Sequence, residues 1–73
     1  MPKTIRTNEY KQVVDRLKQA RLDVGLTQKE VSEKIKKPQS YISKIEAGEQ
    51  RIDVIELKEF ASLYKKQVSF FLK

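Results

Sequence analysis

Apolar residues recur every three or four positions along most of this chain, and the strict alternation typical of strands is absent. This spacing predicts a series of amphipathic helices. The first covers about residues 9–24, with Thr7 or Asn8 as its cap and Gly25 as the left-handed residue after its end. The apolar stripe of this helix consists of Tyr10, Val13 or Val14, Leu17, Ala20 and Val24.

Two short helices are predicted next. Thr27 and Glu30 have the spacing of a capping box, which opens a helix over about residues 28–35. Pro38 ends that helix, because the residue before a proline resists helical geometry, and it opens the next helix, which stops at Gly48. The side chains expected to point inward are Val31 and Ile35 in the first helix and Ile42 and Ile45 in the second.

Two further helices are predicted toward the C-terminus. Asp53 and Glu56 provide a cap and an acidic first turn for a helix over about residues 54–64. The tail over residues 67–73 is predicted to form a short fifth helix with Val68 and Phe71 facing inward. The candidates for burial in the fourth helix are Ile55 or Leu57, Phe60, Ala61, Leu63 and Tyr64.

Five helices with short connections predict a compact all-α fold. We expect residues 9–73 to form a single domain, preceded by a flexible basic arm at residues 1–8 that contains Lys3 and Arg6. A chain of 73 residues buries only a small core, and oligomerisation is a common source of additional stability for such domains.

The charge balance favours a polyanionic partner. The chain has 16 Lys and Arg residues against 10 Asp and Glu residues, which gives a net charge of +6. Nucleic acid is the first candidate for such a surplus. No apolar run approaches the ~20 residues of a membrane span, and the N-terminus lacks the apolar core of a signal peptide. We therefore expect a cytoplasmic protein that does not bind membranes.

The composition argues against catalysis and cofactors. The sequence contains no Cys and no His, which excludes disulfides, thiol catalysis and the usual zinc and iron sites. It also has no glycine-rich phosphate loop and no evident nucleophile–base couple. The sequence therefore indicates no catalytic residue, no metal ligand and no cofactor.

The helix that follows Pro38 carries polar side chains suited to reading DNA. Gln39 can bond adenine N6 and N7, Lys44 suits guanine O6 and N7, and Ser40 can donate to or accept from several bases. Ser40 and Lys44 lie one turn apart on one face of the helix, and Ser43 lies on the same side. A short helix with these side chains leading can enter a major groove.

The run from Gly25 to Gly48 also resembles a known family. Its Leu-Thr-Gln opening, its Gln-Ser pair and its Lys-Ile-Glu-Ala-Gly ending together form a specific signature. On these motifs the chain resembles the Cro-type phage-repressor helix-turn-helix family, also called the XRE family, over roughly residues 13–72. The resemblance implies a lambda-repressor-like DNA-binding domain whose helix-turn-helix is formed by the second and third helices. It places Gln39, Ser40 and Lys44 at base-facing positions.

The resemblance further implies contacts with the DNA backbone. Gln28 matches the family's phosphate-anchoring position, with a plain polar first-turn residue as the alternative. Arg51 and Gln50 are the candidates in the loop after the third helix, where Glu49 departs from the basic residue often found nearby. Tyr41 is a candidate for a thymine methyl or sugar-phosphate contact, with a partly buried surface aromatic as the alternative.

Lys36 and Lys37 replace the small and apolar residues more typical of the family's turn. Both are candidates for phosphate contacts, with a solvated turn as the alternative. Lys36 is expected in a left-handed conformation, at a modest cost.

Arg21 and Glu46 border the apolar stripes of the first and third predicted helices. In the family that the chain resembles, these two positions form an ion pair that joins the first helix to the recognition helix. We therefore expect a structural ion pair between them.

Specific affinity for DNA usually requires two such modules on a two-fold operator. We therefore expect a homodimer that binds a palindromic double-stranded DNA operator and regulates transcription, most often as a repressor. The candidate interface is apolar and consists of Val68, Phe70, Phe71 and Leu72. The alternative is that all four cover the core of the protomer.

A second class of function is an antitoxin-like protein-interaction module, which masks a partner protein and also binds its own promoter. Such a module usually needs an extra segment or an exposed apolar groove. A controller protein of a restriction–modification locus is a related DNA-binding alternative.

Overall fold

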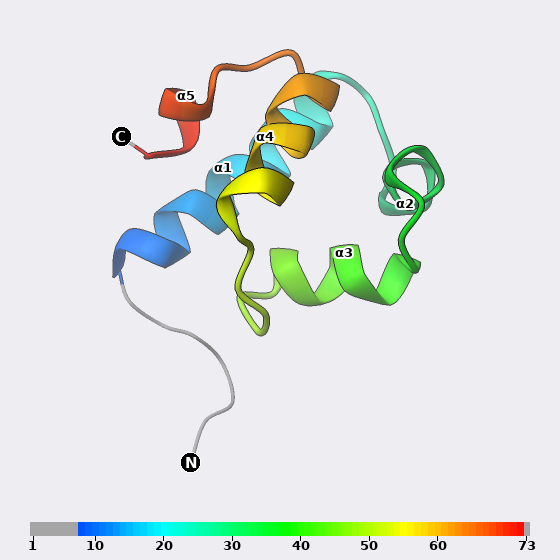
Figure 1. The fold of residues 1–73 in the computed structure, drawn as a ribbon, viewed down its shortest axis with the longest axis horizontal. Helices are drawn as coiled ribbons and strands as arrows, with labels where there is room; N and C mark the ends of the chain where they lie inside the picture. The colour runs from blue at the N-terminus through cyan, green and yellow to red at the C-terminus, as the bar shows by residue number, and fades with distance from the viewer. Residues whose placement is uncertain (1–7, 73) are drawn as a thin grey trace.

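The computed structural model describes residues 8–72, which form five helices and no strand. In Figure 1, α1 and α4 occupy the middle of the molecule, α2 and α3 lie at its right and lower sides, and α5 lies at the upper left. The expected basic arm lies outside the described residues, except for Asn8, which is itself the first residue of α1. The elements are α1 (Asn8–Asp23), α2 (Gln28–Ile35), α3 (Gln39–Glu46), α4 (Val54–Leu63) and α5 (Val68–Leu72).

The starts of α2 and α4 are both fixed by capping boxes, of which the one at α2 was predicted as such and the one at α4 was predicted as a cap with an acidic first turn. The Thr27 hydroxyl accepts the Glu30 amide at 3.1 Å, and the Thr27 amide donates to the Glu30 carboxylate at 2.8 Å. Asp53 and Glu56 make the same reciprocal pair, at 2.7 and 3.1 Å. The hydrogen bonds from Thr27 lower the pKa of Glu30, since they favour its charged form. Local sequence therefore determines where these two helices begin.

The helix ends rely on left-handed residues. Gly25 and Gly48 have φ angles of 76° and 75°, as their positions after α1 and α3 predict. Lys36 adopts φ 60° and ends α2, which confirms the expected left-handed lysine, and Lys65 does the same after α4, which the sequence did not indicate. A side chain in this conformation costs roughly 1–2 kcal/mol, so both turns hold some backbone strain.

One hydrophobic core connects all five helices. Leu57 rather than Ile55 faces this core, since Ile55 is 61% exposed. None of the helices described for residues 8–72 has the length and the apolar content needed to cross a bilayer. The buried members of the core cluster are Leu17, Ala20, Val31, Ile42, Ile45, Leu57, Phe60, Ala61, Tyr64 and Phe71.

The C-terminal helix packs on α1 and closes the core. Phe71 is fully buried within the protomer, which confirms its predicted inward orientation and leaves it no exposed surface for the expected dimer interface. Val68 and Phe70 are half-buried, and Leu72 is 63% exposed. Arg16 of α1 donates to the Phe70 carbonyl at 2.7 Å, which holds α5 against α1.

We predict that Phe71→Ala lowers the free energy of unfolding by about 3–5 kcal/mol, because it leaves a cavity under α5. Leu22→Ala on α1 is the control, and its effect is expected to stay within about 0.5 kcal/mol, because that side chain is exposed and lies outside the proposed dimer surface. Urea unfolding of both variants measures the difference. Equal losses would contradict the assignment of Phe71 to the core.

Candidate nucleic-acid interface

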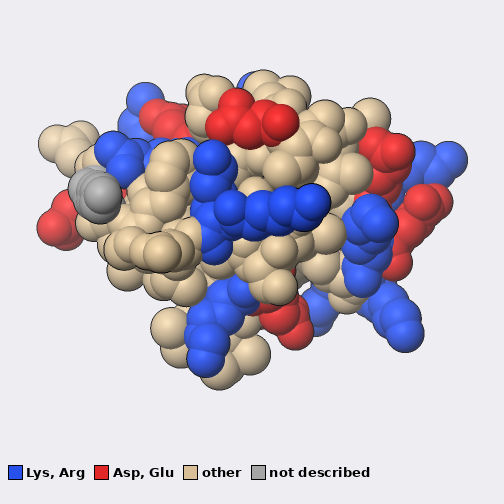
Figure 2. Space-filling view, turned by 90° about the horizontal axis from the view of Figure 1, so that it is seen from above, with Lys and Arg blue, Asp and Glu red and all other residues tan. Residues whose placement is uncertain are grey.

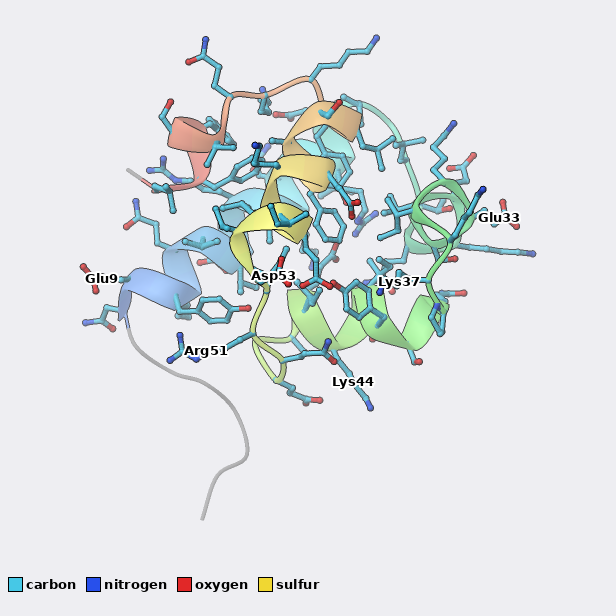
Figure 3. The ribbon with its side chains drawn as sticks, viewed as in Figure 1. Glu9, Glu33, Lys37, Lys44, Arg51 and Asp53 are labelled. Carbon is cyan, nitrogen blue, oxygen red and sulfur yellow. The ribbon has the colours of Figure 1, made fainter. Side chains whose placement is uncertain are left out.

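The outer side of α3 presents a row of polar side chains. Ile42 and Ile45 are each 1% exposed and anchor the inner side of the helix in the core. Lys44 projects from α3 away from the body of the protein (Figure 3). The four predicted base-reading residues are all exposed, and they are Gln39, Ser40, Ser43 and Lys44. Their spacing along the helix places them together on the surface that a DNA groove would meet.

A buried ion pair holds α3 against α1. The Nε of Arg21 donates to Glu46 at 2.7 Å, and a second guanidinium nitrogen donates to the other carboxylate oxygen at 3.1 Å. The two side chains are only 9% and 6% exposed. The hydrogen bond that Arg21 donates to Glu46 raises the pKa of Arg21, because the carboxylate favours the charged guanidinium. A further N–H of Arg21 donates to the Leu26 carbonyl at 2.8 Å, at the entry to α2.

The same carboxylate also binds α2. The side-chain amide of Gln28, the first residue of α2, donates to Glu46 at 3.0 Å. Gln28 is half-buried, so its side chain has an internal partner that its sequence position did not indicate. An amide of this kind has two N–H donors, and the bond to Glu46 uses one of them. Glu46 therefore connects the first residue of α2 to the last residue of α3.

The loop between α3 and α4 is held by a residue that the sequence analysis assigned only to the core. The Tyr10 hydroxyl of α1 donates to the Gln50 carbonyl at 2.6 Å, 40 residues away in the chain. Burial raises the pKa of this hydroxyl, so it stays protonated and able to donate. The signal available in the sequence is that a buried Tyr requires a partner for its hydroxyl.

Arg51 is packed onto that same tyrosine. Its guanidinium lies 5.5 Å from the centroid of the Tyr10 ring, and the side chain is otherwise exposed beside the first turns of α1 (Figure 3). A cation over an aromatic face is attracted by the ring, which limits the positions that the guanidinium samples. Tyr10 thus positions both loop residues that were expected to contact DNA, Gln50 through the backbone and Arg51 through the side chain.

The two lysines of the turn lie in different surroundings. The Lys37 ammonium is 5.2 Å from the centroid of the Tyr41 ring, whereas Lys36 lies beside residues of α4. Tyr41 is half-buried, and burial raises the pKa of its hydroxyl, with nearby Glu56 adding to the rise. The structure therefore places Lys37 and Tyr41 together near α3 and places Lys36 away from them.

Positive charge is not confined to the side that carries α3. Figure 2 views the molecule from above, opposite the side on which α3 lies in Figure 1, and shows Lys and Arg interspersed with Asp and Glu. Net charge alone therefore does not single out the α3 surface, and the case for it depends on the arrangement of its polar side chains. Among residues 8–72, no group of three or more Asp or Glu side chains is placed to hold a metal ion.

Comparison with known proteins gives one family match. The model of a helix-turn-helix family matches residues 17–71, from the middle of α1 to α5, which is most of the chain. The match includes both helices that Glu46 connects and the loop that contains Gln50 and Arg51. The comparison with curated proteins finds no match.

We predict that Arg21→Met destabilises the protein by about 3–5 kcal/mol, because it leaves the Glu46 carboxylate buried without its partner. The double variant Arg21→Met with Glu46→Met is the control, because it removes both charges. It is expected to recover most of the lost stability. Urea unfolding of the single and double variants provides the test, and a double variant less stable than Arg21→Met would contradict this account.

Proposed function

Because the chain belongs to the Cro/C1-type helix-turn-helix family of DNA-binding regulators, we propose that it is a sequence-specific transcriptional repressor that binds an inverted-repeat operator as a homodimer. Its fold is the lambda-repressor-like arrangement of five helices. The observation that carries the proposal is the exposed polar row of α3 on a helix that is fixed from behind by Ile42, Ile45 and Glu46.

The proposed reading surface combines three kinds of side chain. Gln39 at the start of α3 offers paired donor and acceptor atoms that match adenine, and Lys44 offers a cation that matches guanine. Ser40 and Ser43 lie between them and can bond either a base or a phosphate. Because α3 is held at both its inner side and its last residue, these groups need little reordering when they meet the groove.

The proposed backbone contacts flank this row. Gln28 opens α2, where free amides and the helix dipole favour a phosphate, and one N–H of its side chain is available beyond the bond to Glu46. Arg51 and the backbone of Gln50 supply donors from the loop that Tyr10 holds in place. Lys37 lies in the turn between α2 and α3, and its ammonium faces the ring of Tyr41 in the first turn of α3.

The proposed dimer follows from the size of the module. A single helix-turn-helix contacts only a few base pairs, and a two-fold pair reads two half-sites about 34 Å apart. The C-terminal helix offers the exposed Leu72 and the half-buried Phe70 and Val68 as apolar surface for such a pair. Repression then occurs by occupation of the promoter, and the proposal includes no catalytic step.

Selection of bound duplexes from a random DNA library, near physiological salt, tests the proposal. We expect a short inverted repeat in the selected duplexes for the natural chain. We expect Lys44→Ala to weaken binding by about 1–3 kcal/mol and to relax the preference at one or two positions of each half-site. Recovery of no motif would overturn sequence-specific regulation, whereas an unchanged motif for Lys44→Ala would remove only that residue from the reading set.

Arg51→Ala is expected to weaken binding to all duplexes similarly and to reduce the slope of log K against log salt by about 1 unit. The reason is that a phosphate contact releases counterions without reading sequence. We would measure affinity at several salt concentrations, on one selected duplex and on one scrambled duplex. These data give both the loss of affinity and the change of the salt slope. The control is Lys18→Ala on α1, which removes the same charge outside the predicted contacts. An equal change of slope in both variants would contradict a specific role for the loop.

A further inference from the structure

A groove of about 610 Å³ lies between the C-terminal part of α2 and one side of α4. Ile35, Ile55 and Leu63 supply its apolar surface, and Lys34, Lys36 and Lys58 supply its basic groups. None of these residues belongs to the polar row of α3. The groove is therefore a second surface feature of the domain, formed by the helix that precedes the recognition helix and the helix that follows it.

One apolar side chain of the groove is largely open to solvent. Ile55 is 61% exposed at the start of α4, whereas Ile35 and Leu63 are half-buried. Large apolar side chains that stay exposed beside a groove are typical of protein interaction sites. By contrast, the exposed Leu22 lies on α1, outside the groove.

The charges around the groove restrict what can bind there. Three lysines line it against one acidic residue, Glu59, so the partner is expected to carry carboxylates. A DNA backbone would match the lysines but would leave the isoleucine and leucine surfaces without apolar partners. A second copy of this chain, related by a two-fold axis, would bring the same lysine-lined patch against itself, which like charges oppose.

We propose that this groove binds an acidic amphipathic helix of a partner protein. The apolar side of that helix packs on Ile35, Ile55 and Leu63, and its carboxylates meet Lys34, Lys36 and Lys58. The inference goes beyond DNA recognition, because it assigns a protein ligand to a surface that includes only Lys36 among the residues expected to contact DNA.

The test uses two displayed libraries of ~15-residue helical peptides, with leucine-like residues randomised along one side. One library carries glutamates on the other side of the helix, and its twin carries lysines there. We expect enrichment from the acidic library alone. The peptides recovered should bind Ile55→Ser and Lys58→Glu at least about tenfold more weakly than the natural chain.

Matched controls lie on α1. Leu22→Ser removes an equally exposed apolar side chain, and Lys18→Glu makes the same charge reversal, so both are expected to bind the peptides as the natural chain does. All four positions are exposed, and thermal unfolding checks that each variant folds. Equal weakening in the groove variants and the control variants would overturn the proposal, as would enrichment of neither library or of both.

Two further measurements test whether a second copy of the chain or DNA occupies the groove instead. Sedimentation of Ile55→Ser and of the natural chain reports self-association, and loss of a dimer in the variant would assign the groove to a second copy and overturn the proposal. Addition of a selected DNA duplex is expected to leave the peptide bound, because the polar row of α3 does not line the groove. Displacement of the peptide by DNA would also overturn it. The duplex selection is independent of these results, so the failure of either proposal can be recognised separately.

Discussion

The arrangement of α1, α2 and α3 depends on a single buried carboxylate. Glu46 receives two N–H groups from Arg21 and one from Gln28, so its charge is both paired and hydrogen-bonded. Removing a charge from water costs several kcal/mol unless such partners are in place. A shift of α3 away from α1 would leave that charge uncompensated, and a shift of α2 would remove one of its hydrogen bonds.

Buried residues hold α3 and the adjoining loop in the positions that form the exposed surface. Its polar row is exposed because the opposite side of the helix is used for Ile42 and Ile45, and the adjoining loop is held by the Tyr10 hydroxyl. The residues that position the surface are thus distinct from those that would read DNA. A change of sequence preference can therefore arise at Gln39 or Lys44 without loss of the fold, whereas changes at Tyr10 or Glu46 affect both.

Local features of this structure could be predicted from the residue pattern, whereas partners distant in the chain could not. The capping boxes at Thr27 and Asp53 depend on residues three positions apart, and the starts of α2 and α4 follow from them. Resemblance to a family supplied the pairing of Arg21 with Glu46, which the apolar pattern alone leaves unspecified. The bond between Tyr10 and Gln50 joins residues 40 positions apart, and only the folded chain brings them together. Phe71 was predicted to face inward and was also a candidate for the dimer interface, because sequence does not reveal how much of α5 packs against α1.

The attachment of Glu46 at the very end of α3 also affects how this protein responds to heat. A helix of eight residues is unstable in isolation, and frayed ends are usually its first part to open. Here the last residue is bonded to two other helices, so fraying would break the contacts that hold the domain together. We infer that α3 forms one cooperative unit with α1 and α2. DNA affinity should therefore follow the global fraction of folded protein, without a milder transition in which the recognition helix alone is lost.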